Sequence, residues 1–285
     1  MRVSNVYRMF LAIVAFLFTC TVFAVPPPPA NVAEHIRTQN ELFKWVREKV
    51  ADPSVYKVTN HPILTITLKA KKNDPSAVKT IRCPYGTIGT AFTVTDDGYA
   101  ITAAHVVDGS DGSEKCLADV QKQFVKDKLD VKAFDWKFTY EYAVINGVGK
   151  KFEAKLIASL PTDEDDLALI RIADGKGEFT ALQISSASYL SDEMIAVIGS
   201  PIGISDIVVF GKIARHELHK DKLLVIAPIY PGNSGGPVMT LHDRKIVGMV
   251  DIVLIARGSI AEIGGLIPAE KIRVFLEKEL PGRKF

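Results

Sequence analysis

A serine framed by glycines is the feature of this sequence that most directly indicates covalent chemistry. The segment is Pro231-Gly232-Asn233-Ser234-Gly235-Gly236-Pro237-Val238. Glycine permits tight, positive-φ turns that expose a hydroxyl and let a substrate approach the backbone closely. Such a turn could aim the backbone N–H groups of Gly232 and Ser234 at one point, as an oxyanion hole requires. We therefore interpret Ser234 as a candidate nucleophile, although the same glycines could surround an idle serine.

Two further segments could supply the base and the acid that a serine nucleophile needs. His105 follows the strand-like run Tyr99-Ala100-Ile101-Thr102 after two alanines, so its ring could face a cleft from the end of a rigid element. Asp166 opens the apolar run Leu167-Ala168-Leu169-Ile170, where a half-buried carboxylate could accept a hydrogen bond from an imidazole. Each residue alone suits an ordinary structural role, whereas the three together suit a Ser-His-Asp triad.

Short β-strands are the elements that would position these residues. Apolar and hydroxyl residues alternate from Ile63 to Leu68, and Asp97-Gly98 between two strand-like runs is a strong hairpin signal. Many short strands separated by turn residues predict an all-β sandwich or barrel. Further strand patterns cover residues 78–81, 91–94, 99–102, 140–145, 152–157, 167–172, 194–198, 207–214, 223–227, 237–240, 245–252 and 264–267.

Two segments carry apolar residues at helical rather than strand-like spacing. Residues 31–50 predict a short N-terminal helix, and residues 268–280, which begin with a proline, predict a closing helix. Between the strands, residues 111–132 are polar and charged. We expect a long loop there, with room for one helical turn.

The first residues of the chain are typical of an export signal. Arg2 and Arg8 precede an apolar run from Met9 to Ala24, and prolines follow at once. We expect a secretory signal peptide that is cleaved after Ala24, and therefore a periplasmic or secreted protein with no stable membrane insertion. The alternative is an uncleaved anchor helix, for which the apolar run is short. A lipoprotein signal at Cys20 fits less well because the preceding residue is a threonine.

Cleavage of this signal would leave two of the three cysteines, Cys83 and Cys116. An even number in an oxidising compartment permits one disulfide, but two free buried thiols are equally compatible with the sequence. The Cα distance that decides between them is not encoded in the spacing.

The overall composition is that of an ordinary globular protein and excludes two classes of partner. The chain has 285 residues, 47% of them hydrophobic and 24% charged, with a net charge of +2. So small a charge gives no support for a nucleic acid or an anionic membrane surface as a partner, and no basic run is interleaved with aromatics. The pair His216 and His219 has no third ligand in view, so we expect no metal and no cofactor.

The motifs resemble those of the trypsin-like, chymotrypsin-fold serine peptidases, and within them the bacterial high-temperature-requirement A (HtrA), or Deg, branch. The resemblance covers about residues 76–270. It rests on Thr102-Ala103-Ala104-His105, Asp166-Leu167-Ala168-Leu169 and Gly232-Asn233-Ser234-Gly235-Gly236-Pro237, with support from Gly89-Thr90-Ala91-Phe92, residues 198–203 and Val247-Gly248-Met249-Val250. The serine motif is highly specific, whereas the aspartate motif alone would not be.

The resemblance implies a fold and a site. The fold is two antiparallel six-stranded β-barrels, with His105 and Asp166 from the first and Ser234 from the second. We expect a signal peptide over 1–24, a linker and helix over 25–54, the first barrel over 55–175, and the second barrel with the closing helix over 176–285. The primary pocket would be lined by apolar residues and so favour apolar side chains: Ile226, Pro228, Tyr230, Ile252 and Val253.

The resemblance also implies an activity, which is hydrolysis of peptide bonds in protein substrates, with a role in protein quality control and homo-oligomers that form through N-terminal segments. Three departures qualify it. We expect no PDZ domain after residue 285, the stretch between His105 and Asp166 is long, and Asp251 stands where such enzymes usually place Ser or Thr. The N-terminal helix could assemble subunits or act as an inhibitory flap.

Two other interpretations remain open from the sequence. The glycine-framed serine also fits the nucleophile elbow of an α/β-hydrolase, but that fold needs a histidine far beyond the serine. Only His242 follows, eight residues on. The second alternative is a catalytically altered binding or chaperone-like protein built on a peptidase fold.

Overall fold

The computed structural model describes residues 30–69, 73, 77–161, 164–173, 179–187, 189–214, 221–256 and 259–285. The chain divides into two compact units, Met1–Leu42 and Phe43–Phe285. The expected signal peptide, its proline linker and the pair His216 and His219 lie outside the described residues. Among the helices described, none is long and apolar enough to cross a membrane.

The expected N-terminal helix is present as α2 (Ala30–Val46), which begins in the first unit and ends in the second. In the first unit, Arg37 pairs with Glu41 one helical turn away. In the second unit, the chain continues through η1 (Arg47–Ala51) and α3 (Asp52–Ser54) into the first strand. Phe43 and Trp45 in the last turn of α2 contact Phe210 and Arg244 of this unit.

The second unit contains the two closed six-stranded antiparallel β-barrels that the resemblance implied, so the predicted fold class is confirmed. In the first barrel, β5 pairs back onto β1 and closes the sheet. Its strands follow the order β1 (Val55–Leu68), β3 (Thr87–Thr93), β4 (Tyr99–Ala103), β7 (Leu167–Ile172), β6 (Lys151–Leu160) and β5 (Phe134–Ile145).

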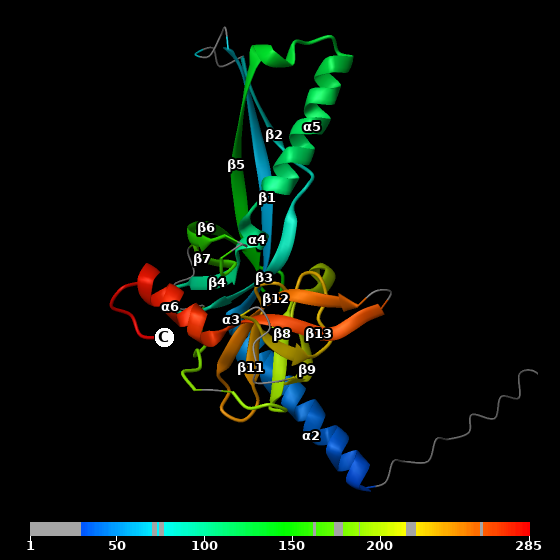
Figure 1. Ribbon diagram of the computed structural model, residues 1–285, viewed down its shortest axis with the longest axis vertical. Coiled ribbons are helices and arrows are strands. Elements are labelled where there is room, and N and C mark those ends of the chain that lie inside the picture. The colour runs from blue at the N-terminus through cyan, green and yellow to red at the C-terminus, as the bar shows by residue number, and fades with distance from the viewer. Residues whose placement is uncertain are drawn as a thin grey trace, which may run out of the picture. The chain divides into compact units, whose positions relative to one another are not determined.

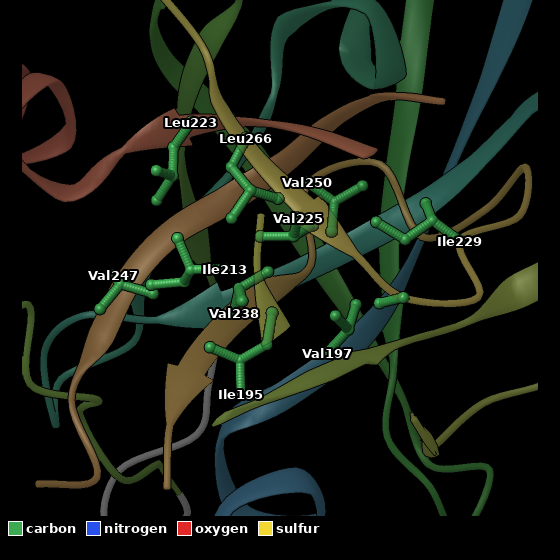
Figure 2. Packing of buried hydrophobic residues seen from close by; sticks show 11 residues of the cluster. Ile195, Val197, Ile213, Leu223, Val225, Ile229, Val238, Val247, Val250 and Leu266 are labelled. Atoms are coloured by element: carbon green, nitrogen blue, oxygen red, sulfur yellow. The ribbon is translucent and has the colours of Figure 1, made fainter. Parts of the chain in front are cut away.

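The second barrel closes through the pairing of β9 with β10. Its strands follow the order β10 (Leu223–Ile226), β13 (Ser259–Pro268), β12 (Ile246–Ala256), β11 (Pro237–Thr240), β8 (Met194–Gly199) and β9 (Ile207–Ile213). Branched aliphatic side chains from these strands point toward one another inside the barrel, among them Ile195, Val225 and Leu266 (Figure 2). On β8 and β10 these positions alternate, Ile195 with Val197 and Leu223 with Val225, because neighbouring residues in a strand point to opposite faces. The closing helix is α6 (Ala269–Glu279), close to its predicted bounds.

Strand β1 is longer than the barrel requires, and its outer half extends from the first barrel. We call this extension, together with β2 and the outer half of β5, the arm. Residues Val55–Asn60 of β1 pair with β3, whereas Ile63–Thr67 leave the barrel and pair with β2 (Val78–Arg82). Strand β5 follows β1 along its whole length, so the two form a long ribbon (Figure 1).

The expectation of a loop over residues 111–132 was wrong, because helix α5 (Ser110–Lys126) occupies most of this stretch and lies along the arm (Figure 1). Cys116, Val120 and Phe124 recur every four residues and so share one helix face. That face packs on the ribbon, where the Phe124 and Trp136 rings lie 5.3 Å apart between centroids. These three apolar residues lie among many charged ones, so the helical periodicity of the sequence is weak. Packing on the ribbon supplies most of the stability of the helix.

The structure also resolves the question of the two cysteines, since Cys83 and Cys116 form a disulfide with a Cα–Cα distance of 5.7 Å. Cys83 follows β2 and Cys116 lies in α5, so the bond joins the helix to the ribbon. Both cysteines are buried in the small apolar cluster of the arm.

We expect the Cys83→Ser/Cys116→Ser double variant to unfold at a lower temperature than the wild type. The disulfide spans 33 residues, and closing a loop of that size stabilises a fold by about 3–4 kcal/mol through the unfolded chain. Thermal melting with and without dithiothreitol measures the effect. Reductant should lower the melting temperature of the wild type and leave that of the double variant unchanged. Identical melting of both oxidised proteins would contradict the expectation.

Candidate active site

The pairing of two neighbouring strands brings His105 and Asp166 together. Strands β4 and β7 run antiparallel with Ala103 opposite Leu167, so the end of β4 lies beside the start of β7. His105 follows β4 in the short helix α4 (Ala104–Val107), and Asp166 immediately precedes β7. Two residues that are far apart in the chain therefore stand at the same edge of the first barrel.

Three hydrogen bonds join the two residues and their neighbours. The His105 Nδ1 and Asp166 Oδ2 atoms lie 2.6 Å apart, and the His105 backbone N–H donates to Oδ1 over 2.9 Å. The backbone N–H of Ala104 donates to the Asp166 carbonyl over 3.0 Å. Asp166 is 1% exposed and His105 is 39% exposed, so the carboxylate is enclosed while the ring remains accessible. The contact through Nδ1 leaves Nε2 as the nitrogen that can serve a reacting group.

The backbone of Asp166 has φ +51°, in the left-handed region that few residues other than glycine adopt. Aspartate tolerates this region better than most side chains because its short polar group can bond locally. The bonds to Ala104 and His105 hold the residue in that conformation.

Electrostatics favour the charged form of both residues. Burial lowers the pKa of His105, but the hydrogen bond and charge of Asp166, together with the charge of Asp251, outweigh it and raise the pKa above its usual value. Burial raises the pKa of Asp166, but hydrogen bonds with His105 and Asp251 outweigh it and leave the pKa below its usual value. Asp166 is therefore a carboxylate at neutral pH, and it stabilises a protonated His105 ring.

The serine turn requires its glycines, as the sequence indicated. Gly232 and Gly235 have φ values of +100° and +83°. A side chain on Gly235 would place its Cβ 2.1 Å from the Thr90 carbonyl oxygen, and one on Gly232 would lie 2.4 Å from the Ser200 carbonyl oxygen. Both the conformation and the lack of space exclude other residues at these positions.

Thr90 on β3 fastens this turn to the first barrel, a role that the sequence reasoning missed. Its hydroxyl donates to the Gly232 carbonyl over 2.7 Å and accepts from the Ser200 N–H over 2.9 Å. Its backbone N–H donates to the Ser234 carbonyl over 2.8 Å. Thr90 is fully buried, so each of these bonds satisfies a polar group that water cannot reach. Its place in the Gly89-Thr90-Ala91-Phe92 motif was the available signal.

The backbone N–H groups of Gly232 and Ser234 are the expected oxyanion donors. The carbonyl oxygens of Pro231 and Gly232 already accept hydrogen bonds within the protein. The Ile202 N–H donates to Pro231 over 2.8 Å, and the Thr90 hydroxyl donates to Gly232 over 2.7 Å. Within the described part of the chain, neither the Gly232 nor the Ser234 N–H donates to a protein acceptor. Two N–H groups on one turn are thus available for a developing negative charge.

The Ser234 hydroxyl donates to the backbone carbonyl of Asp251, with an Oγ–O distance of 3.4 Å. Among the described residues, no hydrogen bond joins this hydroxyl directly to His105. Asp251 lies near both residues, because its carboxylate, the Asp166 carboxylate and the His105 ring each have an atom within 4.8 Å of the others. Catalytic hydrogen bonds are often long before a substrate binds.

The same three side chains are the group most able to hold a metal ion among the described residues. The ammonium of Lys222, however, lies 2.7 Å from the Asp251 carboxylate. A positive charge already adjoins the ligand atoms and opposes a bound cation. The residues therefore fit an ion pair better than a metal centre.

The expected specificity pocket is only partly described. Ile226 and Tyr230 are 38% and 40% exposed, and Pro228 is half-buried. The side chains of Ile252 and Val253 lie outside the described residues. The structure adds exposed apolar residues that the sequence reasoning missed: Ile202, which adjoins Gly232, with Ile88 and Ile204 near Gly203, at 76%, 51% and 55% exposed.

Comparison with known proteins identifies a family and several relatives of this chain. Residues 89–249 match the family described as the trypsin-like peptidase domain. A probable periplasmic serine endoprotease DegP-like from Chlamydia trachomatis is 30% identical over 188 residues, which are 64% of this chain and 31% of that protein. The chloroplastic Protease Do-like 1 of Arabidopsis thaliana is 22% identical over 281 residues, 94% of this chain and 56% of that protein.

A third relative is the magnetosome formation protease MamE of Paramagnetospirillum magneticum, 29% identical over 204 residues, which are 68% of this chain and 24% of that protein. The chain thus spans about a third of the length of the Chlamydia relative.

We expect Gly235→Ala to destabilise the fold far more than Gly149→Ala. Both glycines have positive φ, +83° and +84°, but a Cβ at Gly149 meets nothing within 4 Å, whereas one at Gly235 meets backbone at 2.1 Å. Gly149→Ala should cost about 1–2 kcal/mol from conformation alone. Gly235→Ala should cost about 3 kcal/mol or more because strain and collision add. Urea denaturation of both variants measures the difference, and equal losses would refute the packing argument.

Proposed function

The chain belongs to the trypsin-like peptidase family, and from that premise we propose that it is a serine endopeptidase acting through Ser234, His105 and Asp166. The observation that carries the proposal is the 2.6 Å contact between His105 and the buried Asp166, beside a glycine-framed serine with two available backbone N–H groups. This combination supplies a nucleophile, an oriented base and donors for an oxyanion.

Acylation would begin with attack of Ser234 Oγ on the scissile carbonyl carbon. His105 Nε2 takes the hydroxyl proton, and Asp166 fixes the ring tautomer by accepting from Nδ1–H. The new C–O bond leaves a negative oxygen, which the Gly232 and Ser234 N–H groups receive. The imidazolium then returns its proton to the amine as the C–N bond breaks, and an ester on Ser234 remains.

Deacylation would repeat these steps with water as the nucleophile. His105 takes a proton from water, the hydroxide attacks the ester carbonyl, and Ser234 leaves with the proton that the ring returns. For acylation, the Ser234 hydroxyl must turn from the Asp251 carbonyl, at 3.4 Å, toward His105. The proposed motion is a change of the Ser234 χ1 rotamer, since side chains of this type move between staggered positions.

The hydrogen bond between the Ser234 hydroxyl and the Asp251 carbonyl favours a second candidate function. In this alternative, the chain is a peptidase-fold protein that binds other proteins without cleaving them. If Ser234 stayed on the Asp251 carbonyl, its proton would not reach the base. A fluorophosphonate serine probe separates the two functions, because it reacts only with a serine that its base can deprotonate.

Substrates are proposed to be proteins or peptides with small or medium apolar side chains at the cleavage site. The residues expected to line the primary pocket, Ile226 to Tyr230 and Ile252 to Leu254, include no acid that could attract Arg or Lys. The exposed Ile88, Ile202 and Ile204 offer a further apolar surface beside the serine turn.

Export to the periplasm or outside the cell is proposed from the expected signal peptide and from the name of the Chlamydia relative. We also propose, from the resemblance, that the protein acts in protein quality control and that it forms a homo-oligomer.

We expect Ser234→Ala to fold like the wild type and to lose peptide hydrolysis by roughly ten-thousand-fold or more, because it lacks the nucleophile. Casein cleavage and fluorophosphonate labelling measure the activity, and circular dichroism checks the fold. Ser110→Ala, at an exposed serine of α5, is the matched control and should keep both activities. Cleavage by Ser234→Ala at the wild-type rate would refute the assignment.

The rate of fluorophosphonate labelling should fall on the acidic side with a midpoint above pH 6.5. His105 must be neutral to accept the serine proton, and its pKa is raised above 6.5 despite the opposing effect of burial. A raised pKa means that the proton binds at a higher pH, so reactivity is lost sooner as the solution is acidified. A midpoint at or below pH 6.5 would contradict the electrostatics described for this site.

A further inference from the structure

A β-bulge places Asp251 in the candidate site. Strand β12 pairs with β13 in regular register up to Val250, and the pairing resumes at Ile252 opposite Gly265. Asp251 is the extra residue and has no partner in this ladder. A bulge re-aims a side chain and is common beside active sites. Here the carboxyl side chain is 4% exposed and lies within 4.8 Å of both Asp166 and His105.

Lys222 supplies a positive charge to this buried carboxyl group. Its Nζ atom lies 2.7 Å from Asp251 Oδ2, and its side chain is only 16% exposed. The residue immediately precedes β10, so it reaches the site from another strand of the same barrel. Two charges are rarely removed from water together unless the geometry between them is close, because each loses its hydration.

Asp251 and Asp166 are also linked to each other, as two carboxyl groups that share one hydrogen bond. Burial, followed by the hydrogen bond with Asp166, raises the pKa of Asp251 to about 6, while Lys222 opposes the rise. Below that pH, Asp251 can donate a proton toward Asp166, as a serine or threonine hydroxyl would. Above it, Asp251 brings a second negative charge to the imidazole, which a hydroxyl cannot do.

We propose that Asp251, anchored by Lys222, is a positioning residue of the catalytic site that lies beside the Asp166 carboxylate and sets the electrostatic field at the His105 ring. The inference rests on the proposed function for its catalytic meaning. Its electrostatic part is the effect of the Asp251 charge, which is paired with Lys222, on the pKa of His105. This effect can be tested without measuring turnover. Asp251 also presents its backbone carbonyl to Ser234 Oγ, so one residue lies beside the acid, the base and the nucleophile.

The charges that act on His105 within the described residues are those of Asp166, which precedes β7, and Asp251 on β12. Lys222 acts on Asp251 from the start of β10. Asp165, next to Asp166, is itself paired with Lys271 of α6 and so adds little net charge. Asp251 raises the pKa of His105, so removal of its charge must lower that pKa.

The test compares Asp251→Asn with the wild type by the pH dependence of fluorophosphonate labelling and by NMR titration of the His105 ring. We expect both midpoints to move down by about one pH unit. Asp192→Asn is the matched control, since Asp192 also pairs with a lysine, Lys212, at 2.6 Å but on an exposed surface of the same barrel. The control should leave both midpoints unchanged.

Asp251→Asn leaves Lys222 buried without its partner and could fail to fold. The Lys222→Met/Asp251→Thr variant removes both charges, keeps a hydroxyl beside Asp166, and should also shift the midpoints down. Unchanged midpoints in a folded variant would overturn the inference, even if the labelling rate fell, because a purely structural role would lower the rate alone. Absence of labelling in the wild type would refute the proposed function, and the NMR titration would still decide the inference.

Discussion

The buried charge of Asp166 is the constraint on which the rest of the site depends. A carboxylate that is 1% exposed must be compensated by donors close to it, because burial in a low dielectric disfavours the ionised form. The backbone N–H and the ring of His105 supply two of these donors, at 2.9 and 2.6 Å. The same bonds that satisfy Asp166 therefore orient His105, and the positive φ of Asp166 is the local cost of that arrangement.

Thr90 imposes the second constraint, because it joins a strand of one barrel to the serine turn of the other. Its hydroxyl and backbone N–H together hold Gly232, Ser200 and Ser234. A nucleophile and a base that come from separate barrels keep a fixed separation only if the junction is rigid. Buried hydrogen bonds provide this rigidity, since breaking one leaves a polar group unsatisfied. Asp251 on β12 also lies close to the acid and the base, and its backbone carbonyl accepts from the Ser234 hydroxyl.

The individual strands and the serine turn were predictable because their signals are local, whereas the two-barrel fold and the meeting of His105 with Asp166 were expected only from the resemblance to a known family. A period of two along each strand, a hairpin dipeptide and glycines around a serine all lie within a few residues of one another. The helix α5 was missed because its apolar face consists of few residues and gains its stability from the arm on which it packs. Charged residues outnumber apolar ones in this stretch, and we therefore expected a loop there.

The sequence by itself determined the residue types of the site, their order along the chain and the strand pattern of both barrels. Tertiary structure alone decided three things: the disulfide between Cys83 and Cys116, the hold of Thr90 on the serine turn, and the pairing of Lys222 with Asp251. Each joins residues that are distant in the chain. Their contact depends on strand order, on barrel closure and on a bulge at one residue of β12, and no local pattern encodes these properties.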